Sequence, residues 1–303
     1  MAGFLKDKVV AVTGGGRGIG RAVALLAAQE GAKVIVADYG VAADGSEPSS
    51  EVADEVVAEI AAAGGEALAI AGDVSQMAGG QAIVDLAVEK YGRIDGVVCV
   101  AGILRERMLF NMTEDEFDDV VRVHLKGTFT LYRAASAVMR KQEGGGSLIG
   151  FTSGVWALGS TAQANYAAAK GGIVSMTYAA ALGLARYGVR ANCIAPVART
   201  RMSANVPFDI GPNGEPEDVA PMVIYLLSDA AKDVTGQVYT AVGNKIAVWN
   251  QPTEVRSMFN NERWTPEEIA ERLGTSIGTE PMPQLLKAEE MRRAAAAGER
   301  PNA

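Results

Sequence analysis

The fold of this chain is decided by the stretch V-V-A-V-T-G-G-G-R-G-I-G, which occupies residues 9–20. Its first four residues form an apolar run of strand length, and an amphipathic helical pattern follows from Ala22 to about Gly31. Strand, glycine-rich turn and helix in this order predict a phosphate site, because the glycines let the backbone approach a pyrophosphate and the helix N-terminus offers free N–H groups. A turn that binds no phosphate is the alternative, since the spacing G-x-x-x-G-x-G is not the commoner G-x-G-x-x-G. The predicted cofactor-binding residues of this turn are Gly14, Arg17, Gly18, Ile19 and Gly20.

An acid, Asp38, follows the second predicted strand at residues 33–37. A carboxylate at this place accepts hydrogen bonds from an adenosine ribose and repels a 2′-phosphate, so Asp38 favours NAD over NADP. Arg17 points the other way, because a basic residue in the turn could bind that phosphate. We give more weight to Asp38, since an uncompensated carboxylate beside a phosphate is the costlier arrangement. A helix or turn cap is the alternative role for Asp38.

The alternation of strand and helix continues along the chain and predicts a doubly wound α/β fold with a mostly parallel, seven-stranded sheet. Five further strands are predicted at residues 67–71, 94–100, 147–152, 189–195 and 237–242. Five further helices are predicted at about residues 50–63, 78–91, 113–140, 163–187 and 217–227. The small pair Ala101-Gly102 follows the fourth strand, where it would let the backbone approach a ribose.

A second motif, S-G-V-W-A-L-G-S-T-A-Q-A-N-Y-A-A-A-K, occupies residues 153–170. Tyr166 and Lys170 are four residues apart in Ala-rich surroundings, so a helix places the phenol and the ammonium on one face. Ser153 follows an apolar strand that would deliver it to the same site. A fixed cation favours the phenolate, so Tyr166 could lose its proton near neutral pH while Ser153 holds a substrate oxygen. Because Y-x-x-x-K is common, an ordinary helix with a surface lysine is the alternative.

The chain contains one histidine, His124, in the run V-R-V-H-L-K-G. It falls on the long helix to about Arg140, which the capping box Thr113-Glu114-Asp115-Glu116 is expected to open. Two interpretations stay open. His124 is either a satisfied core residue, as most lone helical histidines are, or a catalytic group, because its helix should pack beside the sheet near the site.

Composition limits the class of protein. Of the 303 residues 49% are apolar and 21% charged, which indicates a globular chain, and a formal charge of −8 argues against a nucleic-acid or anionic-membrane surface. Cys99 and Cys193 both fall in apolar strand-like runs, so we expect core thiols. The N-terminus lacks the pattern of a leader, and no apolar run approaches the roughly 18 residues that span a bilayer. These observations predict a cytoplasmic protein.

Three segments interrupt the α/β rhythm. Residues 39–50 form a long Gly/Ser/Pro-rich loop beside Asp38, and residues 197–216 form an irregular, partly apolar stretch that suits a substrate lid or an ordinary surface loop. We therefore expect one dehydrogenase-sized domain at 1–247 and a C-terminal extension at 248–303 that is no independent domain. Helices are predicted in the extension after Thr265 and from about Leu285 to Ala297, and the last residues, 298–303, are expected to be mobile.

The glycine-rich turn, the βα alternation and the Ser…Tyr-x-x-x-Lys site together resemble the short-chain dehydrogenase/reductase family over roughly residues 5–247. The resemblance implies catalytic roles for Ser153, Tyr166 and Lys170, with Lys170 also binding the nicotinamide ribose. It implies cofactor contacts by further residues: Gly14, Gly18, Gly20, Asp38, Asp73, Val74, Ala101, Gly102, Pro196 and Thr200. It also implies a homo-oligomer, a dimer or homotetramer, formed through the helices that hold His124 and Tyr166.

The chain departs from the family pattern at three places. Cys99-Val100 stand where the family has Asn-Asn, Val197 replaces the glycine after Pro196, and His124 stands where an Asn usually completes a catalytic tetrad. In the family that Asn holds a water that links the lysine to solvent, so His124 is a candidate relay. V-H-L-K-G and A-P-V-A-R-T-R-M at 195–202 also resemble the (3R)-hydroxyacyl-CoA and 17β-hydroxysteroid dehydrogenase domains of the peroxisomal multifunctional enzyme type 2 group.

We therefore predict an NAD-dependent oxidoreductase that interconverts a secondary alcohol and a ketone, with no metal, nucleic-acid or membrane partner. Tyr166 would act as the general base and Ser153 would hold the substrate oxygen. Apolar residues suggest a bulky lipophilic substrate, although core packing is an equal alternative for each: Met108, Leu109, Phe110, Trp156, Leu158, Met202 and Phe208. A non-catalytic dinucleotide sensor or scaffold, and an epimerase or dehydratase on the same fold, are the rival functions.

Overall fold

The computed structural model describes residues 3–40, 51–200 and 214–296. The chain divides into two compact units, Met1–Trp249 and Asn250–Ala303. The predicted lid residues Met202 and Phe208, most of the loop at 39–50 and the terminal residues 298–303 lie outside the described ranges.

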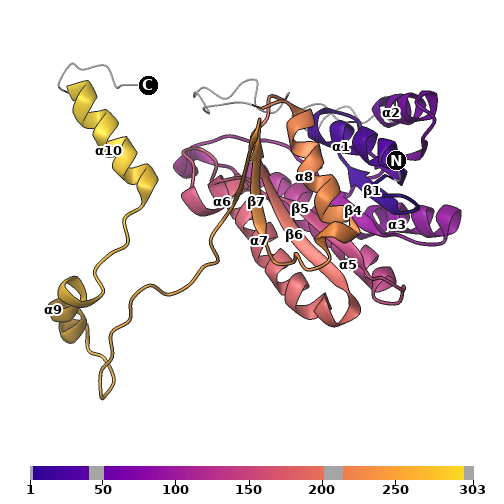
Figure 1. Cartoon of the computed structure of the whole chain (residues 1–303). Coiled ribbons are helices and arrows are strands. Elements are labelled where there is room, and N and C mark those ends of the chain that lie inside the picture. The colour runs from indigo at the N-terminus through magenta and orange to yellow at the C-terminus, as the bar shows by residue number, and fades with distance from the viewer. Residues whose placement is uncertain (1–2, 41–50, 201–213, 297–303) are drawn as a thin grey trace. The chain divides into compact units, whose positions relative to one another are not determined.

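The first unit contains one eight-stranded sheet in the order β3-β2-β1-β4-β5-β6-β7-β8 (Figure 1). The strands are β1 (Val9–Thr13), β2 (Lys33–Ala37), β3 (Glu66–Ile70), β4 (Gly96–Cys99), β5 (Gly146–Phe151), β6 (Val189–Pro196), β7 (Val238–Val242) and β8 (Lys245–Val248). The first seven are parallel, whereas β8 pairs antiparallel with β7. Strands β2 and β3 lie on one side of β1 and β4 lies on the other, so the strand order reverses at β1. Doubly wound folds bind their ligands at such a switch point.

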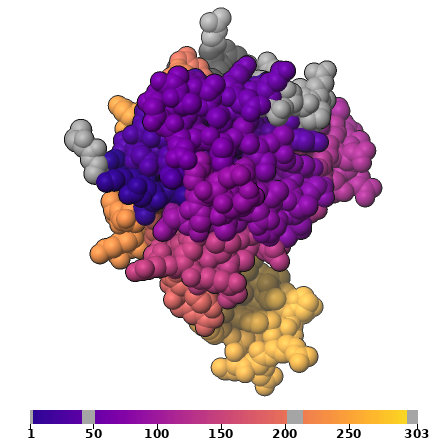
Figure 2. Space-filling view, turned by 90° about the vertical axis from the view of Figure 1, so that its right-hand side faces the viewer, coloured from indigo at the N-terminus to yellow at the C-terminus, as the bar shows by residue number. Residues whose placement is uncertain are grey.

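Helices cover both faces of this sheet, as Figure 1 shows. They are α1 (Gly18–Gln29), α2 (Glu51–Ala62), α3 (Met77–Tyr91), α4 (Glu114–Val121), α5 (Gly127–Met139), α6 (Val155–Leu158), α7 (Ala164–Leu184) and α8 (Pro216–Leu227). Val10 and Val12 belong to a core cluster with α1, α2 and α8, while Val9 and Ala11 belong to another with α3, α5 and α7. Both faces of β1 are therefore buried, which explains its unbroken apolar run. Figure 2 views the molecule from the side that carries α2 and α3, coloured purple.

The sheet has an eighth strand, β8, in addition to the seven that the sequence predicts. Strand β8 is short and mostly exposed, so no buried apolar pattern marks it. It forms a hairpin in which Val242 pairs with Lys245 around the two-residue loop Gly243-Asn244, and Gly243 has a φ of +50°. A Gly-Asn pair between two strands is a hairpin signal, so the sequence did carry one sign of β8.

The single long helix expected from Thr113 to Arg140 is interrupted. Thr113 caps α4 through the predicted box with Glu116, but a π-helical turn, Arg122–Lys126, separates α4 from α5. Single π-turns of this kind are frequent at functional sites, and this one contains His124.

The second unit contains two described helices, α9 (Pro266–Ser276) and α10 (Pro283–Ala296). The helix predicted after Thr265 is confirmed, and Thr265 caps it through a capping box with Glu268. Arg256 donates to the Ile277 carbonyl and pairs with Glu280, which ties the segment before α9 to the segment after it.

Candidate active site

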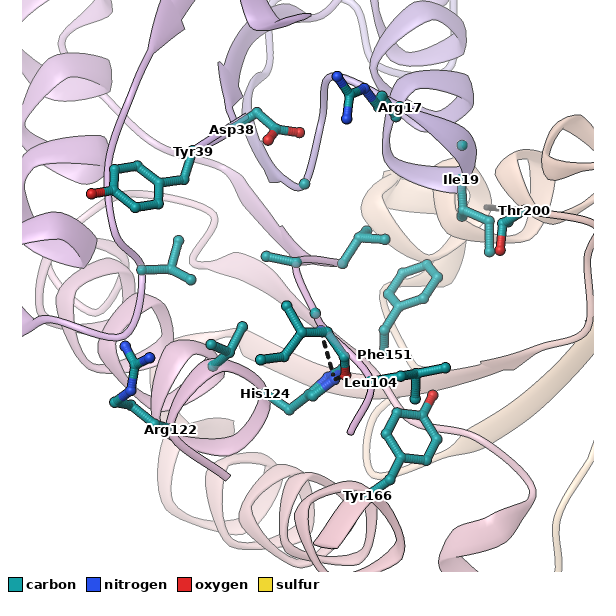
Figure 3. Close-up of a pocket in the computed structure, with 18 of the residues that line it drawn as sticks. Arg17, Ile19, Asp38, Tyr39, Leu104, Arg122, His124, Phe151, Tyr166 and Thr200 are labelled. Atoms are coloured by element: carbon teal, nitrogen blue, oxygen red, sulfur yellow. Dashed lines mark hydrogen bonds between the residues drawn. The ribbon is translucent and has the colours of Figure 1, made fainter. Parts of the chain in front are cut away.

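A cavity of ≈ 560 Å³ lies at the carboxyl ends of the strands around β1 (Figure 3). Its wall includes fourteen of the predicted site residues: Gly14, Arg17, Gly18, Ile19, Asp38, Asp73, Val74, Ala101, Gly102, His124, Tyr166, Lys170, Pro196 and Thr200. Two predicted residues, Gly20 and Ser153, do not line it themselves. The fold thus brings the glycine-rich turn and the Tyr-Lys pair, about 150 residues apart in the sequence, to one cavity.

The glycine-rich turn lets another backbone segment of the protein, the one at Ala101, come close. Gly14 has a φ of +63°, and a Cβ added to it would lie 2.9 Å from the Ala101 nitrogen. Gly20 packs inside the turn, since its Cβ would lie 2.0 Å from the Gly14 carbonyl oxygen. Helix α1 begins at Gly18 with no acidic side chain in its first turn, so its N-terminal N–H groups face the cavity without a competing carboxylate.

The carboxylate of Asp38 is held in place by backbone. One oxygen accepts the Gly16 N–H at 2.9 Å, and the other accepts the Gly40 N–H at 2.7 Å. Each carboxylate oxygen keeps a second lone pair, which a ribose hydroxyl can use. Asp38 therefore serves as a turn cap and still faces the cavity, so the two roles weighed from the sequence are compatible.

Asp73 and Arg122 form a polar cluster at the end of β3. Asp73 accepts hydrogen bonds from the backbone and the hydroxyl of Ser75, at 2.9 Å and 2.6 Å. Arg122 donates to the Ser75 hydroxyl at 2.7 Å and pairs with Asp119 at 2.9 Å. Arg122 and Asp119 line the cavity but carried no sequence motif, and only their place on the π-turn and the helix before it brings them there.

Lys170 is buried, with 4% of its surface exposed. Its Nζ donates to the Phe151 carbonyl at 2.6 Å and lies 5.3 Å from the centre of the Tyr166 ring. Burial lowers the pKa of Lys170 to about 7, an effect that the nearby Cys193 and Cys99 thiols oppose. The alternative of a surface lysine on an ordinary helix is therefore excluded.

The phenol of Tyr166 does not show the lowered pKa that its pairing with Lys170 led us to expect. Burial raises the pKa of Tyr166 to about 12, and the hydrogen bond with the Ser153 hydroxyl only partly offsets this. Desolvation disfavours the phenolate more than the neighbouring groups favour it. In this structure Tyr166 is a neutral phenol that Ser153 contacts directly.

His124 is buried in the core and also forms part of the cavity wall. Its ring is 2% exposed, and its Nε2 lies 2.8 Å from the carbonyl oxygen and 3.1 Å from the nitrogen of Ile103 (Figure 3). Among the described residues its buried Nδ1 has no hydrogen-bond partner. The ring meets Tyr166 edge-on at 5.2 Å between centroids, and a Cβ on Gly102 would lie 2.1 Å from its Cε1. Burial and the Lys170 charge hold the pKa of His124 well below its usual value, so the imidazole is neutral.

The apolar residues suggested for substrate binding lie elsewhere. Leu109 and Phe110 are 71% and 78% exposed on a 3₁₀ turn, and Trp156 packs against Trp249 at 5.6 Å. None of the five that the structure describes lines the cavity: Met108, Leu109, Phe110, Trp156 and Leu158. The segment Ile103–Glu106, which follows β4 and escaped the sequence analysis, forms the wall instead. Its position after a strand end was the one available signal.

A comparison with known families matches residues 14–243 to a model described as enoyl-(acyl carrier protein) reductase, one of the short-chain dehydrogenase models. The chain belongs to the short-chain dehydrogenase/reductase family. It is therefore an NAD(P)-dependent dehydrogenase or reductase, and its cofactor is a nicotinamide dinucleotide.

Individual members of the short-chain dehydrogenase/reductase family are similar over most of the chain. The hydroxyacyl-CoA dehydrogenase ChsB1 of Mycobacterium tuberculosis is 43% identical over 285 residues, which are 89% of this chain and 88% of that protein. The mouse peroxisomal multifunctional enzyme type 2 is 38% identical over 86% of this chain but only 35% of its own length. A crystal structure of a short chain dehydrogenase from Mycobacterium avium superimposes with a TM-score of 0.84 at 42% identity, covering 93% of this chain and 98% of that one.

The site fits the family's cofactor on structural grounds. The glycine cradle, the open N-terminus of α1 and the carboxylate fixed by two backbone amides are the groups that hold a pyrophosphate and a ribose. Among the described residues no cluster of His, Cys, Asp or Glu could hold a metal ion. None of the helices that the structure describes is long and apolar enough to cross a membrane.

Proposed function

We propose that this short-chain dehydrogenase/reductase oxidises a secondary alcohol to a ketone reversibly, with NAD as cofactor and a lipophilic 3-hydroxyacyl-CoA or hydroxysteroid as substrate. One observation carries the proposal: a single cavity contains both the carboxylate of Asp38 and the Tyr166–Lys170 pair. Similarity to proteins named hydroxyacyl-CoA dehydrogenase and peroxisomal multifunctional enzyme supports the acyl-CoA class.

Tyr166 is proposed as the general acid and base. Its hydroxyl contacts Ser153, so a substrate oxygen placed between the two hydroxyls would be held and protonated or deprotonated at one point. Bound NAD supplies the hydride acceptor. Burial raises the pKa of Tyr166 to about 12, so a positive charge beside the phenol would favour its ionisation.

Lys170 is proposed to hold the nicotinamide ribose and to supply part of that charge. Its pKa of about 7 means that small changes around it decide whether the ammonium or the amine is present at neutral pH. His124 stays a candidate relay, since its Nδ1 is the buried polar atom near Tyr166 that has no partner among the described residues. A water on Nδ1 would extend a proton path from the cavity.

The choice of NAD over NADP rests on Asp38. Both of its oxygens are fixed by backbone amides, so the carboxylate cannot swing away from a 2′-phosphate without losing two hydrogen bonds. Arg17 lines the same end of the cavity. Because Arg17 is exposed to solvent, its attraction for a 2′-phosphate is weak and does not offset the repulsion by the fixed carboxylate of Asp38.

A homo-oligomer, a dimer or tetramer, is proposed for the assembly. Large apolar side chains are exposed on the helices around the site: Phe117 on α4, Phe129 on α5 and Leu182 on α7.

The two buried free thiols, Cys99 and Cys193, are compatible with the cytoplasmic location predicted from the sequence.

The rival function of a non-catalytic dinucleotide sensor rests on one departure from the family pattern. His124 occupies the position of the family's catalytic Asn. Epimerisation or dehydration would use the same groups without net formation of NADH.

The deciding experiment measures NADH and NADPH formation by the purified protein with 3-hydroxyacyl-CoAs, steroid alcohols and small secondary alcohols. Turnover with NAD supports the proposal, and the best substrate fixes the class. Tight NADH binding without turnover, unchanged in a His124→Asn variant, would move the sensor ahead. Product that forms without NADH would indicate the epimerase or dehydratase chemistry.

A further inference from the structure

Two segments meet beside the catalytic tyrosine. The wall segment Ile103–Arg107 follows β4, and the approach segment Ala162–Asn165 leads into α7. Arg107 N–H donates to the Ala162 carbonyl at 2.8 Å, and Gln163 donates to the Glu106 carboxylate at 2.5 Å. The two segments also form a parallel bridge between Arg107 and Gln163.

Asn165 joins these segments from inside. The residue is 1% exposed, and its amide nitrogen donates to the carbonyls of Arg105 and Glu116, both at 2.8 Å. Its amide oxygen accepts the N–H of Tyr166 at 2.7 Å. One buried side chain therefore connects the cavity wall, the first turn of α4 and the backbone of the catalytic residue.

The wall segment is fixed at two points by buried side chains. His124 contacts both backbone polar atoms of Ile103, and Asn165 holds the carbonyl of Arg105 two residues later. Between and beside these points, Ile103, Leu104 and Arg105 face the cavity. A shift of the wall segment relative to the phenol of Tyr166 would strain or break these contacts.

The approach segment also holds a strained residue. Ala162 has a φ of +63°, in the left-handed region that disfavours residues with a Cβ. Its carbonyl is the group that accepts the Arg107 N–H. Such strain persists where surrounding contacts over-determine the backbone, and it collects at functional sites.

We propose that Asn165 is a positioning residue, which fixes the wall segment Ile103–Arg107 to Tyr166 and thereby sets the place of the substrate carbon relative to the phenol. The inference rests on the proposed function, because it takes this wall to face the substrate. A misplacement of about 1 Å can cost a reaction about 100-fold, so loss of the amide should lower kcat by about 10- to 100-fold. Dinucleotide affinity should stay unchanged, since Asn165 does not line the cavity.

The test compares Asn165→Ala with Asn192→Ala. Asn192 is a matched control, because it is also buried and its amide also bonds two backbone groups, the Val234 carbonyl and the Gln237 N–H, on β6 away from the wall. Hydrogen exchange, NADH affinity, kcat and KM are measured for each variant and for the wild type. In Asn165→Ala, amides of residues 103–107 should exchange about tenfold faster or more, whereas Asn192→Ala should leave them unchanged.

A second variant separates positioning from folding. In Asn165→Asp the new carboxyl faces the two carbonyl oxygens that the amide served, so only its protonated form can donate a hydrogen bond to one of them. The activity of Asn165→Asp relative to wild type should therefore recover as the pH falls. Should Asn165→Ala fail to fold, Asn165→Ser keeps one donor and replaces it.

The outcomes are distinct. Faster exchange at 103–107 together with a lower kcat and unchanged NADH affinity supports the positioning role. Unchanged exchange, an unchanged kcat, or equal losses in the Asn165 and Asn192 variants overturns it. A wild type that binds NADH but turns nothing over contradicts the proposed function and the positioning role together. In contrast, an active wild type with unaffected Asn165 variants contradicts the positioning role alone.

Discussion

The two ends of the cavity are built from different materials (Figure 3). The nucleotide end uses backbone: glycines at 14, 18 and 20, the free N-terminus of α1, and Asp38 fixed by two backbone amides. The catalytic end uses side chains, the buried Lys170 and His124 and the half-buried Tyr166, whose pKa values are shifted by burial. Backbone N–H and C=O groups do not titrate, so their hydrogen-bonding capacity does not depend on burial. The ionisation of the side chains, in contrast, depends on the whole fold around them, so each end should fail in its own way.

The largest effect should come from the catalytic end. Tyr166→Phe removes the proton-transfer group and should lower kcat by about 10²–10⁴-fold, while NADH affinity, set by the nucleotide end, stays within a small factor. Steady-state kinetics and NADH fluorescence titration measure the two quantities. Tyr178→Phe, on the same helix, is the control and should change neither. Weak NADH binding by Tyr166→Phe would show that the catalytic end also determines cofactor affinity, contrary to this prediction.

Lys170→Met should change how stability depends on pH. With a pKa of about 7 in the folded protein against 10.5 in the unfolded chain, wild-type Lys170 releases its proton on folding between these pH values. The unfolded state then binds more protons, so the free energy of unfolding rises with pH by roughly 1.4 kcal/mol per pH unit across this window.

Lys170→Met lacks this rise, so the variant should be the more stable protein near pH 7 and lose that advantage toward pH 10. Urea unfolding at several pH values measures the difference. Lys126→Met, at an exposed lysine of the π-turn, should run parallel to the wild type. A pH-independent difference between Lys170→Met and the wild type would show that burial does not control this end.

A specificity change should come from the nucleotide end. Asp38→Ala removes the acceptor for the ribose and the charge that repels a 2′-phosphate, so the ratio of kcat/KM with NAD to that with NADP should fall by about 10- to 100-fold. Parallel assays with the two cofactors measure it. Asp54→Ala, at an exposed acid on α2, should keep the wild-type ratio. An unchanged ratio in Asp38→Ala would assign the choice to another residue of that end.

The smallest expected effect concerns backbone strain, which differs between the two ends of the cavity. At the nucleotide end positive φ angles fall on Gly14 and Gly18, whereas at the catalytic end one falls on Ala162. Ala162→Gly should raise the free energy of unfolding by about 0.5 kcal/mol, since relief of the left-handed strain exceeds the extra entropy of the unfolded chain. Ala179→Gly, in the exposed interior of α7, should lower it by about 1 kcal/mol. Denaturant titration distinguishes the two, and a loss in both would mean that Ala162 is not strained.

Local patterns predicted a large part of this molecule. The doubly wound parallel sheet follows from apolar runs of strand length that alternate with amphipathic helices, and the structure confirms it. The capping box at Thr113 and the helix start after Thr265 are confirmed, because each depends on residues within a few positions of one another. The expectation of core thiols at Cys99 and Cys193 is confirmed for the same kind of reason, since both lie in buried strands.

Contacts between distant segments could not be predicted in this way. The wall segment Ile103–Arg107 carries no motif, and its place is fixed by His124 and Asn165 from two other elements. The π-turn at Arg122–Lys126 interrupts a pattern that is helical throughout. Strand β8 has little buried surface to mark it.

By itself, the sequence determined the nucleotide end, because a strand, three glycines and an acid at the next strand end specify backbone geometry within about thirty residues. It also predicted which side chains could do the proposed chemistry, Ser153, Tyr166, Lys170 and His124. Only the tertiary structure decided their charge. Burial raises the pKa of Tyr166 and lowers those of Lys170 and His124, and desolvation is a property of everything packed around a group rather than of its neighbours in the chain.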